Sequence, residues 1–210
     1  MSRFGSDPLD FFNSVYNATP PWDIETVQPA MAALLGRYPP VSPVLDVGCG
    51  SGDLSVYLAQ LGYRVTGIDF VEAAITRAQE KRRSLPPNVA DLLTFQVADA
   101  LKPSTLGGRF GAIVDSGFFH LFDSEQCEQF IDELEAVLLP DGRYYMHEFA
   151  VEFPVPNMPR RITAEELEAR FTTKRGWRIK EIQQVEFLSR VAPPVAAICA
   201  CIDRMNSSET

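Results

Sequence analysis

Basic charge is scarce in this chain of 210 residues. Lysine and arginine together number 19 against 28 aspartates and glutamates, which gives a net charge of −9. Proteins that bind nucleic acid use lysine and arginine to neutralise phosphates. The short basic runs at 81–83 and 174–175 are too small for that purpose and are expected to be solvated surface. The composition therefore predicts no nucleic-acid partner and favours a small molecule.

Cysteine and histidine are also rare, with four cysteines and two histidines in the whole chain. The cysteines do not show the spacing of a zinc site, and two histidines add few further ligands. Cys127 is expected on a helix, and Cys199 and Cys201 on one face of a late strand. We therefore predict no metal site and free, buried thiols, which are typical of a reducing compartment.

Long apolar runs are absent as well. No stretch of about 18 or more apolar residues occurs, so no transmembrane helix and no membrane partner are expected. The first residues lack a charged region followed by an apolar one, so no signal peptide is apparent. We predict a cytoplasmic protein, a monomer or homodimer, whose length suits a single domain over 1–210.

A glycine-rich loop is the most informative segment that is present. The apolar strand Val44–Val47 runs into Gly48-Cys49-Gly50-Ser51-Gly52, and a helix follows from about Asp53. Glycines at alternate positions let the backbone turn sharply and bring N–H groups close to a ligand. The next strand ends at Asp69, about 20 residues later, where a carboxylate can bind the hydroxyls of a ribose. The segment therefore predicts a site for an adenosine-containing cofactor.

Two acids in and beside this loop distinguish between possible cofactors. The dinucleotide fingerprint is G-x-G-x-x-G, but Asp53 stands at its third glycine and Asp46 precedes the first one. A negative loop opposes a pyrophosphate and suits a cationic ligand, although Asp53 can also be a simple helix cap. An NAD-dependent oxidoreductase remains the alternative at this point.

The chain resembles the class I S-adenosylmethionine-dependent methyltransferases from about residue 40 to 150. Leu45–Gly52 is similar to their first motif, and Asp69 stands at the position of the ribose-binding acid. Val97–Ala100 is similar to the motif after the third strand, whose Asp99 would lie near the adenine amino group. Phe110–Asp115 matches the fourth strand, and Leu138–Arg143 the turn before the fifth, although Pro140-Asp141-Gly142 replaces the usual Pro-Gly-Gly.

The resemblance implies S-adenosyl-L-methionine as the cofactor and a set of residues that bind it. That set is Trp22, Asp46, Gly48, Cys49, Gly50, Gly52, Asp69, Phe70, Asp99, Ala100 and Asp115. It also implies an α/β fold: a Rossmann-like, doubly wound, mostly parallel seven-stranded sheet with an antiparallel last strand and an N-terminal helical lid. Residues 1–40 would form the lid segment, 41–150 the cofactor-binding core, and 151–210 an acceptor loop and the closing strands.

A shorter resemblance occurs before the core. Thr19–Ile24 followed by Gln28-Pro29 looks like the Thr-Pro-Trp-Asp segment of thiopurine, thiol and halide methyltransferase-like proteins. In that group the aromatic residue helps to cover the methionine end of the cofactor, a role that would fall to Trp22. The extra proline, Pro21, is a departure, and Trp22 can also be a structural anchor. The resemblance favours a heteroatom (S, O or N) of a small hydrophobic molecule as methyl acceptor.

The alternation of apolar segments agrees with this fold. Strands are expected near 44–47, 64–68, 93–97, 110–114, 143–148, 178–189 and 195–203, and helices near 30–37, 53–61, 71–83, 124–138 and 164–171. A capping box is expected at Thr163 with Glu166.

Catalytic candidates follow the fourth and fifth strands, because sheets of this kind bind ligands at the carboxyl ends of their strands. His120 can act as a general base for a hydroxyl acceptor, or it can only shape the pocket. On the fifth strand, either His147 or Glu148 should face the cleft. The proline-rich stretch 151–161 is expected to contact the acceptor. A non-catalytic protein that binds the cofactor is the remaining alternative.

Overall fold

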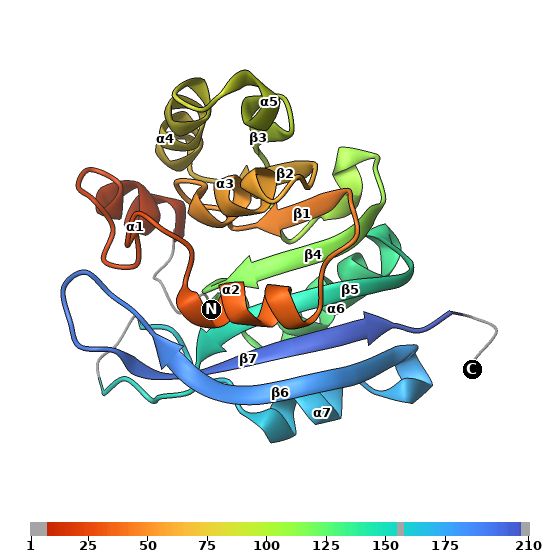
Figure 1. The fold of residues 1–210 in the computed structure, drawn as a ribbon. Coiled ribbons are helices and arrows are strands. Elements are labelled where there is room, and N and C mark those ends of the chain that lie inside the picture. Colours follow the sequence, from red (N-terminus) through yellow and green to blue (C-terminus); the bar gives the residue numbers. More distant parts are fainter. Residues whose placement is uncertain (1–7, 155–157, 207–210) are drawn as a thin grey trace.

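The computed structural model describes residues 8–154 and 158–206. Its centre is a seven-stranded sheet with the order β3-β2-β1-β4-β5-β7-β6 (Figure 1). The strands are β1 (Val44–Val47), β2 (Val65–Asp69), β3 (Leu93–Val97), β4 (Phe110–Ser116), β5 (Leu138–Phe149), β6 (Trp177–Phe187) and β7 (Val195–Arg204). Only β7 runs against its neighbours, β5 and β6, within this sheet. The predicted mostly parallel sheet with an antiparallel last strand is therefore confirmed.

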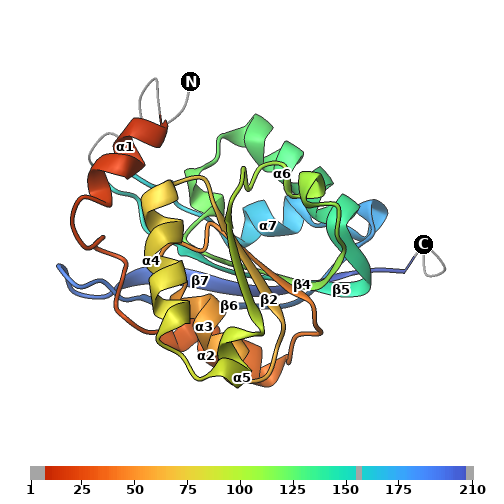
Figure 2. The same cartoon turned by 90° about the horizontal axis from the view of Figure 1, so that it is seen from above.

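Helices cover both faces of the sheet (Figure 2). They are α1 (Pro8–Val15), α2 (Pro29–Arg37), α3 (Asp53–Gln60), α4 (Glu72–Arg83), α5 (Pro87–Ala90), α6 (Ser124–Val137) and α7 (Ala164–Arg170), with short 3-10 turns η1 (Pro103–Leu106), η2 (Phe119–Leu121) and η3 (Thr173–Arg175). Side chains of α2, α3 and α4 share one hydrophobic cluster with the sheet, and those of α6 and α7 share the other. This is the doubly wound arrangement that the alternating pattern predicts.

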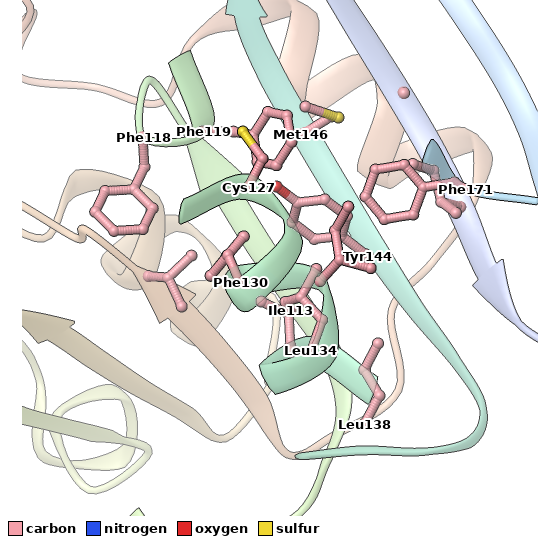
Figure 3. Packing of buried hydrophobic residues seen from close by; sticks show 14 of the residues in the cluster. Ile113, Phe118, Phe119, Cys127, Phe130, Leu134, Leu138, Tyr144, Met146 and Phe171 are labelled. Carbon is pink, nitrogen blue, oxygen red and sulfur yellow. The ribbon is translucent and has the colours of Figure 1, made fainter. Parts of the chain in front are cut away.

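The core beneath α6 is built from large apolar and aromatic side chains (Figure 3). The predicted helix contributes a stripe of Cys127, Phe130, Ile131 and Leu134, all fully buried against β4 and β5. Asp123 caps the helix, because its side chain accepts the Gln126 backbone N–H while the Gln126 side chain accepts the Asp123 N–H. These contacts fix α6 and the turn before it, which includes His120.

Some local details differ from the sequence prediction. Strand β5 already begins at Leu138, and the expected turn lies inside it, with Asp141 at φ +61° and an irregular pairing opposite β4. Thr163 caps α7 through the Glu166 N–H, but the Glu166 carboxylate binds Arg160 and Arg170, so the reciprocal half of the predicted box is replaced by ion pairs. Helix α1 lies in the segment predicted as a helical lid, but its bounds were not predicted.

The N-terminal segment divides into two parts. Helix α2 lies in the layer on the sheet, with Met31, Leu34 and Leu35 in its core. Helix α1 and the chain that follows it lie instead beyond the carboxyl ends of β1 and β4, next to the β6–β7 loop (Figure 1). The strand order reverses between β1 and β4, and open α/β sheets form their ligand crevice at such a point.

Candidate active site

One cavity of about 470 Å³ lies at these strand ends. Its walls come from the glycine-rich loop, from α1 and residues 16–28, from the turn after β4, and from the loop 188–194 between β6 and β7. The volume falls within the range of about 300–1,000 Å³ that is usual for pockets of small molecules and cofactors.

The glycine-rich loop has no room for side chains. Gly48 has φ +62°, and a Cβ there would lie 2.6 Å from Cδ2 of Phe118. Gly50 has φ +54°, and its Cβ would lie 2.8 Å from the Tyr16 hydroxyl. Both glycines line the cavity, so the backbone itself forms this wall. A ligand in the cavity can therefore approach the backbone closely here, and binding of an adenosine-containing ligand by these glycines stays a prediction.

Asp69 lies at the end of β2 and connects this strand to the loop. Its Oδ2 accepts the Gly50 N–H at 3.0 Å, and its Oδ1 accepts the Val71 N–H at 2.9 Å. Burial raises the pKa of Asp69, and the hydrogen bonds from Val71, Gly50 and Phe70 oppose that rise. The carboxylate lines the cavity, where it is placed to accept ribose hydroxyls.

Asp46 lies below the loop at the end of β1. Its Oδ2 accepts the Ser55 hydroxyl at 2.6 Å. Burial raises the pKa of Asp46 to about 7, and the Asp115 and Asp69 carboxylates add to the rise, while Ser55 lowers it. A cationic ligand in the adjoining cavity would favour the ionised form of this acid.

Asp23 and Asp53 join the N-terminal segment to the loop. The Ser51 hydroxyl lies 2.7 Å from Oδ2 of Asp23 and 3.3 Å from Oδ2 of Asp53. Lys81 binds Oδ1 of Asp53 at 2.6 Å and the Ser51 hydroxyl at 3.0 Å. Lys81 therefore binds the glycine-rich loop. The prediction that it is only solvated surface is wrong. Asp53 makes no capping hydrogen bond, and Gly52 occupies the N-cap position of α3.

Aromatic residues of the N-terminal segment cover the loop. The ring of Trp22 makes edge contacts with Phe12 and Tyr16, with centroids 6.2 and 6.4 Å away. Arg77 on α4 lies 5.6 Å from the centroid of the Tyr16 ring and donates to the Tyr16 carbonyl at 2.7 Å. Tyr16 and Trp22 both line the cavity, so this segment has the predicted position of a lid.

The other half of the cavity has apolar and aromatic walls. These come from Phe118, Leu121, Phe149, Phe153, Met158, Phe187, Leu188, Val191 and Val195. Among the lining residues of this half that the structure describes, His120 is the one that can exchange a proton near neutral pH. Its ring stacks on Phe149 with 4.8 Å between centroids and 24° between planes.

Two buried carboxyl groups lie behind His120. Glu148 Oε2 is 2.5 Å from Nδ1 of His120 and accepts the His120 backbone N–H at 3.2 Å. Asp115 accepts the backbone N–H groups of Phe118 and Phe119 at 2.9 and 3.1 Å, and the Tyr144 hydroxyl at 2.7 Å. His147 is buried beside them, stacked on Phe187, and does not line the cavity.

The structure brings most of the predicted residues together. The cavity is lined by Trp22, Asp46, Gly48, Cys49, Gly50, Asp69, Phe70, Ala100 and His120. Gly52 lies outside the lining, where a Cβ would be 2.8 Å from Phe95 Cζ, so its part in the site is packing. Asp99 is exposed and accepts the Leu101 N–H at 2.9 Å, and Asp115 is buried beneath the site. Ligand contacts of these acids stay predictions.

Several lining residues were missed by the sequence analysis. Tyr16 and Gln28 line the cavity, as does the loop 188–194. Gln28 donates to the Leu188 carbonyl and accepts the Leu188 N–H, both at 3.0 Å, and so ties the N-terminal segment to this loop. Nothing in the loop sequence indicates this contact. Of the stretch 151–161, Phe153, Met158 and Pro159 line the cavity, and 155–157 lie outside the described residues.

Metal ligands and membrane helices were searched within the described residues. No three His, Cys, Asp or Glu side chains among them are grouped as a metal ion would require. No helix in 8–154 or 158–206 has the length and apolar character to cross a membrane.

The half of the cavity that the glycine-rich loop lines has residues that fit S-adenosylmethionine. Gly48 and Gly50 expose the backbone, and the acids at 23, 46, 53 and 69 all line the cavity. Opposite charges attract strongly in such a partly buried site, so this half favours a sulfonium cation over a pyrophosphate.

Comparison with known proteins identifies the family. Residues 44–142 match the methyltransferase domain family. The chain is 32% identical to the 2-heptyl-1-hydroxyquinolin-4(1H)-one methyltransferase of Mycobacteroides abscessus over 184 residues, 82% of this chain and 78% of that protein. It is also 33% identical over 107 residues to an uncharacterised methyltransferase of Schizosaccharomyces pombe, which is 51% of this chain and 71% of that protein.

Solved structures give the same result. A structure from a study of the conversion of a disulfide bond into a thioacetal group during echinomycin biosynthesis has a TM-score of 0.79 at 29% identity, covering 96% of this chain and 95% of that one. An S-adenosylmethionine-dependent methyltransferase from Anabaena variabilis shares the fold, with a TM-score of 0.74 at 21% identity and 93% of each chain covered. These comparisons contradict the alternative of an NAD-dependent oxidoreductase. The chain belongs to the class I S-adenosylmethionine-dependent methyltransferases.

Proposed function

We propose that the enzyme methylates an ionisable heteroatom, a hydroxyl or thiol, on a small aromatic acceptor. The observation that carries this proposal is the composition of the acceptor half: aromatic and aliphatic walls with His120 as their proton-exchanging side chain. Such walls bind a flat apolar molecule, and one histidine is enough to remove a proton from the acceptor atom.

The shape of this half favours an aromatic acceptor. The rings of His120 and Phe149 are stacked, and Phe187 lies 4.6 Å from Phe149 between centroids, at 41°. Together they form a continuous aromatic surface beside Gly117, which has no side chain to cover it. Aromatic pairs of this kind add about 0.5–1.5 kcal/mol beyond the burial of area. A planar ring system therefore binds here better than a flexible aliphatic chain of equal size.

The chemistry needs little more than alignment and a base. S-adenosylmethionine, when bound by the glycine loop and Asp69, supplies a methyl group that the sulfonium already activates. The chain aligns the acceptor by its walls and excludes water under Trp22 and the loop 188–194. Because Glu148 contacts Nδ1 of His120, a proton from the acceptor goes to Nε2.

The relative from Mycobacteroides abscessus supports a hydroxyl on a heteroaromatic ring, since a hydroxyquinolinone is what its name gives as substrate. An apolar rim adds to this similarity. Trp22 and Val191 line the cavity and are 37% and 73% exposed, which leaves an apolar border where an alkyl substituent of the acceptor can reach the surface.

An acceptor panel tests the proposal. Phenols, hydroxyquinolines, thiols and amines are incubated with S-adenosylmethionine, and release of S-adenosylhomocysteine is followed. We expect turnover with hydroxyl or thiol compounds on aromatic rings. Binding of S-adenosylmethionine without turnover of any compound contradicts the proposal.

His120 is tested with two variants. His120→Ala is expected to lower kcat by roughly 10²-fold or more, and cofactor affinity should be retained. His120→Asn keeps a polar side chain at this wall but has no basic nitrogen, so it should be equally slow. A loss below a few-fold in either variant contradicts the role of base and leaves His120 as part of the wall.

The proposal includes the setting of the enzyme. A monomer or homodimer in the cytoplasm, without nucleic acid, is supported by the net charge of −9 and by the four cysteines, which are all unpaired. Size-exclusion chromatography with light scattering tests the oligomeric state. Residues 1–210 act as one domain in this proposal.

A further inference from the structure

Glu148 lies behind His120 near the end of β5, with a fully buried side chain. Glutamate is almost never buried to this degree unless it is paired. Its Oε2 contacts both the Nδ1 atom and the backbone N–H of His120, at 2.5 and 3.2 Å. One oxygen therefore contacts the ring of this histidine and accepts a hydrogen bond from its main chain.

The second oxygen of Glu148 is held as firmly. Oε1 accepts the backbone N–H groups of Phe118 and Phe119 at 3.3 and 3.1 Å. These groups lie at the start of η2, where backbone donors have no partner within the turn itself. The carboxylate cannot rotate without breaking several hydrogen bonds, so its orientation towards His120 is fixed before any ligand binds.

The neighbouring groups leave the negative charge on Glu148. Burial and the Glu148 carboxylate raise the pKa of Asp115 well above its usual range. Burial also raises the pKa of Glu148, to about 7, but hydrogen bonds from Asp115 and from the η2 backbone lower it. Of two adjacent buried carboxyl groups, the one with more donors keeps the charge. The proton of the pair therefore belongs to Asp115.

Three other titratable groups around this pair are neutral at pH 7, and a fourth, Asp46, has a pKa that burial and the Asp115 carboxylate raise to about 7. Burial and nearby acids raise the pKa of Tyr144, which is also on β5. Burial lowers the pKa of His147 to about 4 and raises that of Cys199, on β7, to about 12. His120 is thus the group of this buried cluster, within the described residues, that can balance the charge of Glu148 with a proton.

We propose that Glu148 is the positioning residue of His120, and that its carboxylate accepts the Nδ1–H so that Nε2 is the nitrogen that takes the acceptor proton. The inference rests on the proposed function. The proton moves from the acceptor heteroatom to Nε2, the imidazolium is balanced by Glu148, and the proton then leaves to solvent. An orienting carboxylate behind a histidine base selects the tautomer in the same way in hydrolases.

The test is Glu148→Gln with acceptors of different acidity. Two accepted aromatic hydroxyl compounds are used, one ionised at the assay pH, such as a nitrophenol, and one not ionised, such as an unsubstituted phenol. The amide can donate to Nδ1 and so place the proton on Nε2. We expect kcat to fall roughly 10²-fold or more for the weakly acidic acceptor and to stay within a few-fold for the ionised one. Affinity for S-adenosylhomocysteine should not change.

Equal losses on both acceptors, or no loss on either, overturn the inference, because a purely structural role lowers both rates alike. Tyr144→Phe is the matched control: it removes a hydroxyl from the same buried cluster that contacts Asp115 and not His120, and both rates should stay near wild type. If Glu148→Gln does not fold, Glu148→Asp gives the same comparison, since its shorter carboxylate moves away from Nδ1.

The two hypotheses fail in different ways. Absence of methylation for every compound in wild-type enzyme contradicts the proposed function. Methylation that responds equally to Glu148→Gln for both acceptors contradicts only the role of Glu148. The pH dependence of kcat gives a second test. In Glu148→Gln the imidazolium of His120 loses its stabilising charge, so the acidic limb of the kcat profile should move to lower pH.

Discussion

Asp69 shows how one residue can serve structure and binding together. Its two oxygens accept the N–H groups of Gly50 and Val71, and the side chain still lines the cavity. A carboxylate with two oxygens has more acceptor positions than these two donors use. The remaining positions are available to hydroxyl groups of a ligand, so we predict that the affinity for the cofactor depends on the same side chain as the fold of the loop.

We predict that Asp69→Ala weakens binding of S-adenosylhomocysteine by about 1–3 kcal/mol, because charged hydrogen bonds are lost in a buried place. Isothermal titration calorimetry measures the change. Asp69→Asn is the control, since it keeps one acceptor oxygen and should lie between Ala and wild type. Unchanged affinity in both variants would show that Asp69 does not contact the ligand.

At the scale of elements, segments from opposite ends of the sequence meet at the cavity. Residues 16–28 and the loop 188–194 meet through the paired hydrogen bonds of Gln28 with Leu188. Pro21 adds a second connection, because its carbonyl accepts the Arg190 N–H at 2.9 Å and the Ser189 hydroxyl at 3.1 Å. The position of this loop therefore depends on the N-terminal segment.

We predict that Gln28→Ala loosens the loop 188–194 and raises KM for the acceptor, while kcat changes less. Amide hydrogen exchange of a peptide spanning this loop should become faster, since two partly buried hydrogen bonds, together worth about 1–3 kcal/mol, are lost. Gln183→Ala is the matched control: it removes a glutamine contact of β6 with Arg37 on the exposed side. Unaltered exchange in Gln28→Ala would refute the connection.

The sequence predicted the elements with strong local patterns. The strand before the glycine loop and the helices near 53–61 and 124–138 were confirmed, because each depends on short-range periodicity. The pairing of Gln28 with Leu188 could not be predicted, since the two residues lie 160 positions apart. The early start of β5 was missed because Asp141 and Gly142 have the composition of a turn.

The same difference between local patterns and long-range contacts applies to the site. Residues on the loop were found from the motif, whereas the contact between Glu148 and His120 depends on how β5 lies beside β4. Lys81 was taken for surface because its neighbours are charged, but α4 directs it to Asp53 and Ser51. Residue type alone does not show which face of a helix meets a loop.

For the whole molecule, the buried acids determine how stability depends on pH. Burial raises the pKa of Asp46 to about 7 and that of Asp115 well above its usual range, while it lowers the pKa of His147 to about 4. Between about pH 4 and 7 the folded acids keep protons that the unfolded chain has lost, so stability falls as pH rises. His147 acts in the opposite direction up to about pH 6.5, because the unfolded histidine binds a proton there.

We predict that the cofactor-free enzyme is less stable at pH 7.5 than at pH 5.5, with a slope of roughly 1.4 kcal/mol per pH unit for each uncompensated proton. Urea unfolding at both pH values measures the free energy of unfolding. Asp46→Asn removes one of these acids and should flatten the dependence. A wild-type curve that rises from pH 5.5 to 7.5 would show that these acids ionise normally in the folded state.

The division of the cavity has a consequence for how such enzymes diversify. The half with the glycine-rich loop comes mainly from residues 46–71, which are close together in the chain. The other half comes from segments after them, and its loop 188–194 is joined to the N-terminal segment by Gln28 and Leu188. Mutations at distant, independent sites act additively. New acceptors can therefore arise by replacing terminal segments together, as a matched pair, without renewed selection for the methyl donor. Exchange of only one of the two segments would break the hydrogen bonds between Gln28 and Leu188, and selection would remove such a variant.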